Sequence, residues 1–254
     1  MSRIKLSIVV PVLNSHEVVR RQLLYYERIG LDADTELILV DDGSDPPIEN
    51  TSRLQVTIHR TNDKRPWTWA LARNAGARIA QGEYLLMYDL DHIVPGFAIN
   101  FIRQFTGLKV QFVREFGVLD EFGNLTQDRG VLERYGLPKF KGLKLGPLPN
   151  NFAMKRELFW ELGGYREDLV ENPYPQGEDR AWRSSWRTYE LRHGGEGSCV
   201  CEHRPRTYMF PNGKFIGDVD ADPQGLFHGL TRKTHKNYWW QQQKRQQDES
   251  GIRD

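Results

Sequence analysis

The sequence lacks several features that mark particular classes of protein. None of its apolar runs approaches the ~20 residues that a membrane-spanning helix needs, so we predict no transmembrane segment. Its 35 Lys and Arg residues nearly balance 34 Asp and Glu residues, and the formal net charge of +1 points to neither a nucleic-acid nor a membrane partner. The two cysteines, Cys199 and Cys201, are too close together to form a useful disulfide, which favours a reducing, cytoplasmic location.

The N-terminus also lacks the marks of a secretory signal. The stretch MSRIKLSIVVPVLN has a short apolar core but no small-residue cleavage site, and we interpret it as leading into a first strand. The chain has 254 residues, of which 39% are hydrophobic, and this is enough for a sizeable core. No internal repeat or low-complexity linker divides the chain. We therefore predict a single domain over residues 1–254.

Apolar strands alternate with helices through the first hundred residues. The strands are expected at residues 6–13, 35–44, 54–60 and 83–92, and the helices at residues 15–30 and 67–82. This order predicts an α/β fold with a mainly parallel sheet flanked by helices. Ligands bind at the carboxyl ends of such strands. The acidic pairs Asp41–Asp42 and Asp89–Asp91 both lie at predicted strand ends.

The second half of the sequence is less regular. Residues 117–148, rich in Gly, Lys and Pro, predict a loop or excursion, and a polar, basic and aromatic tail ends the chain. The regular elements expected here are a helix at 96–105, a strand at 108–116, a short strand and a helix within 150–168, a helix at 177–191 and a strand-like segment at 198–204.

Asp89 and Asp91 form an Asp-x-Asp motif at the tip of a predicted buried strand. Two carboxylates with one residue between them suit a hard divalent cation such as Mg2+ or Mn2+, which keeps open positions for phosphate oxygens. Such an ion neutralises charge on a pyrophosphate leaving group. A solvated acidic turn is the alternative, because the motif alone arises readily by chance.

Five motifs occur in a fixed order along the chain, namely VVPVLN, LILVDDGS, ALARNAGARIAQGEYLLMYDLD, NNFAMKRELFWELGGY and GED. Together they make roughly residues 5–205 resemble the family-2 glycosyltransferases with the GT-A fold. The resemblance implies a nucleotide-sugar-binding half (1–105), an acceptor and catalytic half (106–205) and a C-terminal extension (206–254). It also implies an inverting enzyme that moves a sugar from a nucleotide-diphosphate sugar, with UDP favoured over GDP, to an acceptor hydroxyl.

The resemblance assigns a set of nucleotide-binding residues. Asp42, with Asp41 beside it, occupies the place of the acidic pair that holds the base, where a carboxylate would accept a charge-assisted hydrogen bond. A structural role in an Asp-Gly turn is the alternative for this pair, and a solvated helix face is the alternative for Arg73. The full expected set is Pro11, Asp41, Asp42, Arg65, Arg73, Asn74 and Asp89.

The resemblance also assigns metal ligands. Asp89 and Asp91 match the metal-binding pair, and His203 matches a later histidine that closes the site in related enzymes. His92 is expected behind the ligands or exposed. His228 and His235 are the reserve candidates for the third ligand. A zinc cluster of Cys199, Cys201 and His203 is disfavoured, because zinc-thiolate sites use spacers that fold around the ion.

The GED motif supplies the predicted catalytic acids. The resemblance makes Asp179 the general base that deprotonates the acceptor hydroxyl, and makes Glu178 the residue that assists it. Acids in the first turn of a helix are the alternative, because they suit the helix dipole. The nearby tryptophans offer either a sugar-stacking platform or helical core; these are Trp160, Trp182 and Trp186.

Three other interpretations remain open at this stage. A sugar-1-phosphate nucleotidyltransferase would need a glycine-rich, basic first loop, and PVLNSHEVVRR contains no glycine. A non-catalytic sugar-binding module would not need the acidic residues that are present. The tail RKTHKNYWWQQQKR interleaves bases and aromatics, so a modified base in DNA is a further possible acceptor beside a glycan, a lipid-linked sugar or a protein. The alternative for the tail is that Tyr238, Trp239 and Trp240 pack on the domain.

Overall fold

The computed structural model describes residues 3–63, 68–139, 141–146, 148, 150–171 and 177–211. Arg65, His228, His235 and the aromatic tail therefore lie outside the described residues. The first part of the chain forms β1 (Leu6–Val12), α1 (His16–Ile29), β2 (Thr35–Asp41), β3 (Val56–Arg60), α2 (Trp69–Ile79) and β4 (Tyr84–Met87).

The remaining described elements follow in the order β5 (His92–Ile93), α3 (Gly96–Gln104), β6 (Lys109–Gln111), β7 (Val113–Phe116), β8 (Val118–Leu119), β9 (Leu125–Thr126), α4 (Arg129–Arg134), β10 (Lys144–Leu145), β11 (Phe152–Lys155), α5 (Arg156–Glu161), a 3-10 helix (Glu167–Glu171), α6 (Glu178–Arg192) and β12 (Arg206–Met209).

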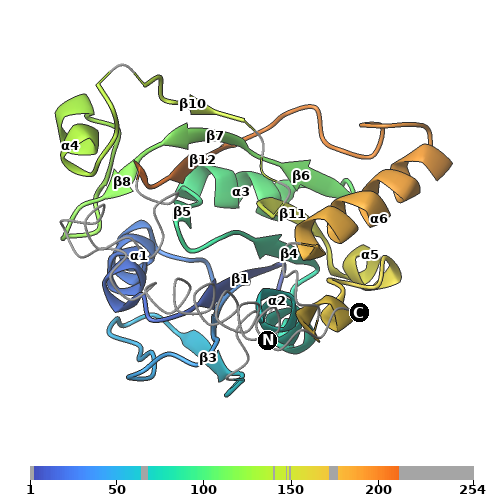
Figure 1. The fold of residues 1–254 in the computed structure, drawn as a ribbon, viewed down its shortest axis with the longest axis horizontal. Coiled ribbons are helices and arrows are strands. Elements are labelled where there is room, and N and C mark those ends of the chain that lie inside the picture. The colour runs from blue at the N-terminus through green and yellow to red at the C-terminus, as the bar shows by residue number, and fades with distance from the viewer. Residues whose placement is uncertain are drawn as a thin grey trace, which may run out of the picture.

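The central sheet has six strands in the order β3-β2-β1-β4-β11-β6. The first four strands are parallel, and β11 runs antiparallel to both β4 and β6. Helices cover this sheet, with α1 and α2 on different sides of it (Figure 1). The mixed α/β architecture with a mainly parallel sheet, predicted from the sequence, is confirmed.

Alternation along the strands builds a core on each face of the sheet. Ile8 and Val10 of β1 pack in the core that contains α1, whereas Val9 between them packs in the core that contains α2. Leu85 and Leu86 of β4 divide between the two cores in the same way. Because successive side chains of a strand point to opposite faces, a strand with helices on both faces must be apolar throughout.

A second sheet, in the order β10-β7-β12-β5, stands beside the first. It corrects two sequence predictions. The strand expected at 108–116 is two strands, because buried Phe112 separates β6 in the first sheet from β7 in the second. The segment 198–204 holds only an isolated bridge, from Val200 to Lys109, and the strand of this region is β12 instead.

The Asp-x-Asp motif lies where the chain crosses between the sheets. β4 ends at Met87, and the chain re-enters a strand only at His92, in β5 of the second sheet. The tip of the predicted strand 83–92 is therefore a turn that links two sheets, and this turn delivers Asp89 and Asp91.

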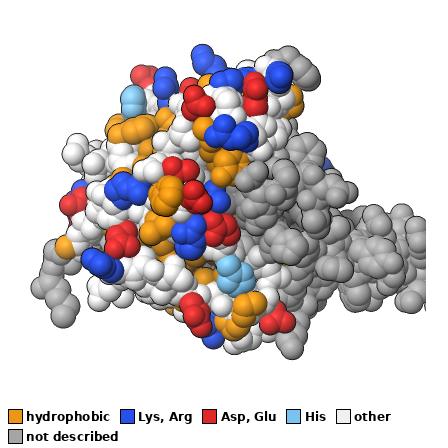
Figure 2. All heavy atoms as spheres, turned by 90° about the vertical axis from the view of Figure 1, so that its left-hand side faces the viewer, with side chains coloured by type: hydrophobic (Ala, Val, Ile, Leu, Met, Phe, Trp, Pro, Cys, Tyr) orange, Lys and Arg blue, Asp and Glu red, His pale blue; other side chains and the backbone are white. Residues whose placement is uncertain are grey.

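The length of the helices and the distribution of surface charge are relevant to membrane and nucleic-acid partners. Among the described residues, no helix is long and apolar enough to cross a bilayer. On the described part of the face in Figure 2, positive and negative side chains are interspersed rather than gathered by sign. This distribution agrees with the near-zero net charge of the chain.

Candidate active site

A cavity of about 540 Å³ opens beside the carboxyl ends of β1, β2 and β4. Both sheets contribute to its lining, because Pro11 and Asp42 come from the first sheet and Arg114 and Met209 from the second. Its charged and polar lining residues are Asp42, Asp89, Asp91, His92, Arg114, Lys141, Lys144, Asn150, Glu178 and Asp179.

The Asp-x-Asp turn is held from both sides. The backbone N–H of Asp89 donates to Asn151 Oδ1 at 3.2 Å, next to β11 of the first sheet. The carbonyl oxygen of Asp91 accepts from the N–H of Phe210 at 2.8 Å, at the end of β12 in the second sheet. Between them, the buried amide of Gln22 donates to the carbonyl of Leu90 at 2.7 Å. The two carboxylates therefore keep a fixed separation.

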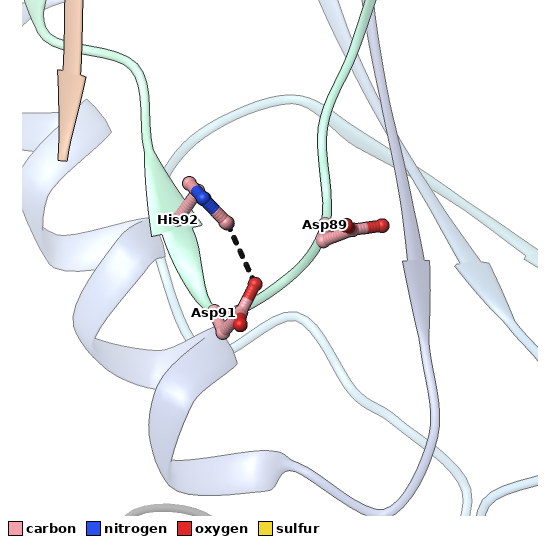
Figure 3. A group of neighbouring side chains, drawn as sticks. All are labelled: Asp89, Asp91 and His92. Atoms are coloured by element: carbon pink, nitrogen blue, oxygen red, sulfur yellow. Dashed lines mark hydrogen bonds and ion pairs between the residues drawn. The ribbon is translucent and has the colours of Figure 1, made fainter. Parts of the chain in front are cut away.

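Asp89, Asp91 and His92 each bring a potential ligand atom within 4.8 Å of the others. Figure 3 shows Asp89 on the limb of the turn that leads in from β4, with Asp91 and His92 joined by a hydrogen bond. Carboxylate oxygens are the donors that Mg2+ and Mn2+ prefer, so the donor set fits the divalent cation expected from the sequence.

His92 is buried, which contradicts the exposed position considered for it and agrees with a position behind the ligands. Its Nδ1 lies 2.6 Å from Asp91 Oδ1, and its Nε2 lies 3.3 Å from Arg114 Nη1. Because a guanidinium only donates, Nε2 must accept and Nδ1 must carry the proton. Both ring nitrogens are thus engaged, and His92 orients Asp91 while the two carboxylates remain the ligand candidates.

Arg73 is fully buried on α2, which contradicts the solvated helix face considered for it. Its guanidinium pairs with Asp89 and lies against the rings of Trp69 and Tyr165, with centroids at 5.3 and 5.2 Å. Arg73 does not line the cavity, so it reaches the site through Asp89 rather than by direct contact. Burial is the strongest single influence and opposes the charge of Arg73, but Asp89 together with Tyr165, Asp179 and Glu178 outweighs it and raises the pKa of the guanidinium.

For the carboxyl of Asp89, burial and the ion pair with Arg73 also act on the pKa in opposite directions. Burial raises the pKa of its carboxyl, and Arg73 acts against this rise. A buried carboxylate needs such a partner to remain charged. The arginine therefore favours the ionised form of a carboxylate that lines the cavity.

The acidic pair after β2 divides into two roles. Asp41 faces away from the cavity, and its carboxylate accepts from the N–H groups of Ser44 at 2.8 Å and Ile48 at 3.0 Å. Asp42 lines the cavity, and its two oxygens accept from Thr61 Oγ1 at 3.1 Å and Thr68 Oγ1 at 2.5 Å. The structure corrects the expectation for Asp41, which holds the turn, and keeps Asp42 as a candidate ligand-binding residue.

Asn74 also departs from its predicted place beside the nucleotide. It is buried, and its side chain exchanges hydrogen bonds with the backbone of Tyr165, donating at 2.8 Å and accepting at 3.0 Å. Asn74 does not line the cavity, so its role is to fasten the turn after α5 to α2.

Glu178 and Asp179 are the first two residues of α6, and both also line the cavity. A place in the first turn of a helix therefore does not exclude either residue from the site. Asp179 Oδ1 accepts from Asn150 Nδ2 at 2.6 Å, and Tyr165 donates its hydroxyl to Asn150 Oδ1 at 3.2 Å. Among the described residues, no hydrogen bond engages the second oxygen of Asp179. A carboxylate held by one oxygen, with the other open to a cavity, is suited to accept a proton.

His203 lies away from the two aspartates, and this corrects its assignment as a metal ligand. Its side chain is exposed, and its ring packs on Phe101 of α3 with centroids 4.8 Å apart. Trp182 and Trp186 are buried in the core around α6, so the core interpretation is confirmed for these two tryptophans. Trp160 is partly buried under Arg78 and does not line the cavity.

The sequence analysis missed several residues of the cavity. Asn150 stands in the NNFAMK motif and was not singled out, although a paired asparagine before a strand is a polar signal. Arg114, Lys141 and Lys144 come from segments whose pairing the sequence does not reveal, so no local pattern connects them to the Asp-x-Asp turn.

Comparisons with known proteins agree on one fold. The model of glycosyl transferase family 2 matches residues 7–163. The structure is similar to that of S. aureus TarS 1-349, with a TM-score of 0.50 and 13% identity over 92% of this chain and 72% of that one. It is equally similar to the mannosyltransferase PcManGT from Pyrobaculum calidifontis in complex with GDP-Man and Mn2+, with a TM-score of 0.50 and 17% identity over 94% of this chain and 72% of that one. No curated protein sequence matches the chain.

Proposed function

This chain belongs to glycosyl transferase family 2 and has the GT-A fold, and from that premise we propose that it transfers a sugar from a nucleotide-diphosphate sugar to an acceptor hydroxyl with inversion at the anomeric carbon. The observation that carries the proposal is one cavity that holds both an Asp89–Asp91 pair and a hydrogen-bonded Asp179. The first suits the leaving-group side of the reaction, and the second suits the acceptor side.

The nucleotide is proposed to bind at the carboxyl edge of the first sheet. Asp42 would accept from the base N–H, with the backbone of Pro11 beside the base and ribose. A UDP-sugar is the favoured donor and a GDP-sugar the alternative. Arg65, also assigned to this site by sequence, lies outside the described residues.

Asp89 and Asp91 would hold a divalent cation, Mn2+ or Mg2+. When bound, the ion would neutralise charge on the diphosphate as the sugar leaves. Arg73 would keep Asp89 ionised, and His92 would keep Asp91 in orientation. The structural neighbour PcManGT, which shares the fold, was solved with Mn2+ and GDP-Man, and this supports metal use here.

Asp179 is proposed as the general base. The acceptor oxygen attacks the anomeric carbon from the face opposite the diphosphate, the bond from this carbon to the diphosphate oxygen breaks, and the hydroxyl proton passes to Asp179. Asn150 holds Oδ1 of Asp179, so the other oxygen would receive the proton. Glu178, next to it on α6, would help to orient the acceptor.

Release of free nucleotide from a panel of UDP- and GDP-sugars tests the proposal, with candidate acceptors added one at a time. We expect release to need a divalent cation, to stop in EDTA and to return when Mn2+ or Mg2+ is added in excess. Asp91→Ala is expected to remove the metal dependence of nucleotide binding while the protein stays folded. Full turnover in EDTA would contradict the metal role, and nucleotide binding without any release would favour a non-catalytic module.

A further inference from the structure

The second-sheet side of the cavity carries three positive side chains that the proposed reaction does not use. Arg114 lies on β7, Lys144 on β10, and Lys141 on the segment that leads into β10. We call these three residues the cationic wall. In Figure 1, β7 and β10 lie on the far side of the molecule from β1 and α2. The wall therefore lines the cavity from the side of the second sheet, whereas Pro11 and Asp42 line it from the first.

Arg114 is the fixed member of the wall. Its Nε donates to the carbonyl of Gly146 at 2.7 Å, and its Nη1 lies 3.3 Å from His92 Nε2 and 3.7 Å from Met209 Sδ. Its side chain is half-buried, and burial lowers the pKa of the guanidinium while Asp91 and Asp89 oppose this shift. These contacts set the position of a positive charge beside the Asp-x-Asp turn.

Lys141 lies in a segment whose backbone carbonyls accept hydrogen bonds from another arginine. Arg129 of α4 donates to the carbonyls of Pro138 at 2.7 Å and Lys141 at 2.5 Å, and also to that of Lys139. Its Nε is itself paired with Glu133 at 2.9 Å. The backbone that presents Lys141 to the cavity is therefore tied to α4, while the ammonium group keeps its freedom.

Among the described residues, the wall has no acidic partner at ion-pair distance. In the part of the chain that the structure describes, no carboxylate lies within ion-pair distance of Arg114, Lys141 or Lys144. Lys144 lies opposite Glu115 in the β7–β10 register, but Glu115 is buried and engages Gln127 at 3.0 Å and Arg206 at 3.5 Å. Lys141 and Lys144 thus have no carboxylate partner among the described residues, and together with Arg114, whose charge Asp91 and Asp89 partly offset, they are suited to a bound anion.

On the basis of the proposed function, we infer that the cationic wall binds an anionic group of the acceptor, and that this group is a phosphate. The diphosphate of the donor would be neutralised at Asp89 and Asp91 by the divalent cation, which leaves the wall for a second anion. Lysine and arginine are the usual partners of phosphate in proteins. The acceptor is thus assigned to the class of hydroxyl compounds that carry a phosphate close to the reacting hydroxyl.

Binding of small probes to the full chain tests the inference. The protein is loaded with Mg2+ and with UDP or GDP, whichever it binds, and is titrated with glycerol, glycerate and glycerol 3-phosphate by ligand-observed NMR. We expect glycerol 3-phosphate to bind most tightly. The double variant Lys141→Gln/Lys144→Gln should weaken its binding about 5-fold or more and leave nucleotide affinity unchanged. Lys139→Gln is the matched control, because Lys139 is exposed on the same segment but does not line the cavity.

The possible outcomes separate the inference from the proposed function. Equal binding of glycerol and glycerol 3-phosphate overturns the inference, and so does a double variant that loses nucleotide affinity instead, because the wall would then serve the donor. Glycerate that binds as tightly as glycerol 3-phosphate overturns the choice of phosphate. If the unmodified protein binds neither nucleotide with Mg2+, it is the proposed function that fails.

Discussion

The two sides of the cavity hold their charged groups in different ways. The carboxylates of Asp42, Asp89, Asp91 and Asp179 each accept a hydrogen bond or ion pair from a neighbouring side chain. Lys141 and Lys144, on the other side, are exposed and meet no carboxylate among the described residues. A group that must meet a reacting atom benefits from a position fixed in advance. A group that only attracts an anion can remain mobile.

The largest expected effect is on the fixed side, at Asp179. Asp179→Asn keeps the size of the side chain but cannot take the acceptor proton, so turnover should fall ~100- to 10,000-fold while affinity for the donor is retained. The product of an α-linked nucleotide sugar should be β-linked by NMR. An α-linked product, or turnover close to that of the unmodified protein, would mean that another group, such as Glu178, receives the proton.

Asp42 and Asp41 provide a second test within one acidic pair. Asp42→Asn should weaken nucleotide binding about 10- to 150-fold, because a hydrogen bond to a charged partner contributes about 1.5–3 kcal/mol. Isothermal calorimetry measures this loss. Asp41→Asn is the matched control: its carboxylate serves the N–H groups of the turn, so this variant should lose stability and keep its nucleotide affinity. The reverse pattern would assign the base contact to Asp41.

Asn150 tests whether fixed geometry matters on the acceptor side. Asn150→Ala frees Asp179 from its hydrogen bond, and we expect turnover to fall about 10- to 100-fold with little change in donor KM, because misplacement of a reacting group by ~1 Å can cost about 100-fold. Asn150 acts through Asp179, so adding Asn150→Ala to Asp179→Asn should cause no further loss. Independent, multiplying effects would show that Asn150 contacts the substrate itself.

The parallel part of the first sheet is the part of the fold that the sequence predicts well. The apolar runs of β1, β2 and β4 are covered on both faces, and this leaves a continuous signal in the sequence. The split of residues 108–116 between two sheets has no such signal, because it depends on which distant strands pair with each half. The same lack of local information misplaced the strand at 198–204 and, with it, His203.

The site residues follow the same division. Asp42, Asp89, Asp91 and the GED acids were identified because they follow predicted strand ends or match family motifs. The burial of Arg73 was not predictable, because a charged residue is buried only when a partner such as Asp89 meets it in the folded state. Asn150 and the cationic wall depend on contacts between segments far apart in the chain, which a single sequence does not contain.

The last expected effect is on stability rather than activity, and it concerns a positive charge that is buried, in contrast to those of the cationic wall. Lys109 begins β6, and its Nζ lies 4.0 Å from the ring centroid of Trp186 and 5.2 Å from that of Phe152. Burial lowers the pKa of this lysine to about 7, while Glu190 opposes the shift. The folded protein thus resists charging Lys109, and the unfolded chain, with a pKa of 10.5, binds that proton more tightly.

The unfolding free energy should therefore rise with pH between about 7 and 10.5, because in this window the unfolded state binds the extra proton. Below pH 7 both states are charged and the full penalty applies. Lys109→Met removes the penalty, and urea unfolding at pH 6 should show a gain of about 1–4 kcal/mol that shrinks towards pH 10. Lys144→Met, which removes an exposed charge of the wall, should change stability by about 0.5 kcal/mol or less at either pH. A gain for Lys109→Met that is equal at both pH values would mean that packing, rather than the buried charge, distinguishes Lys109 from the wall.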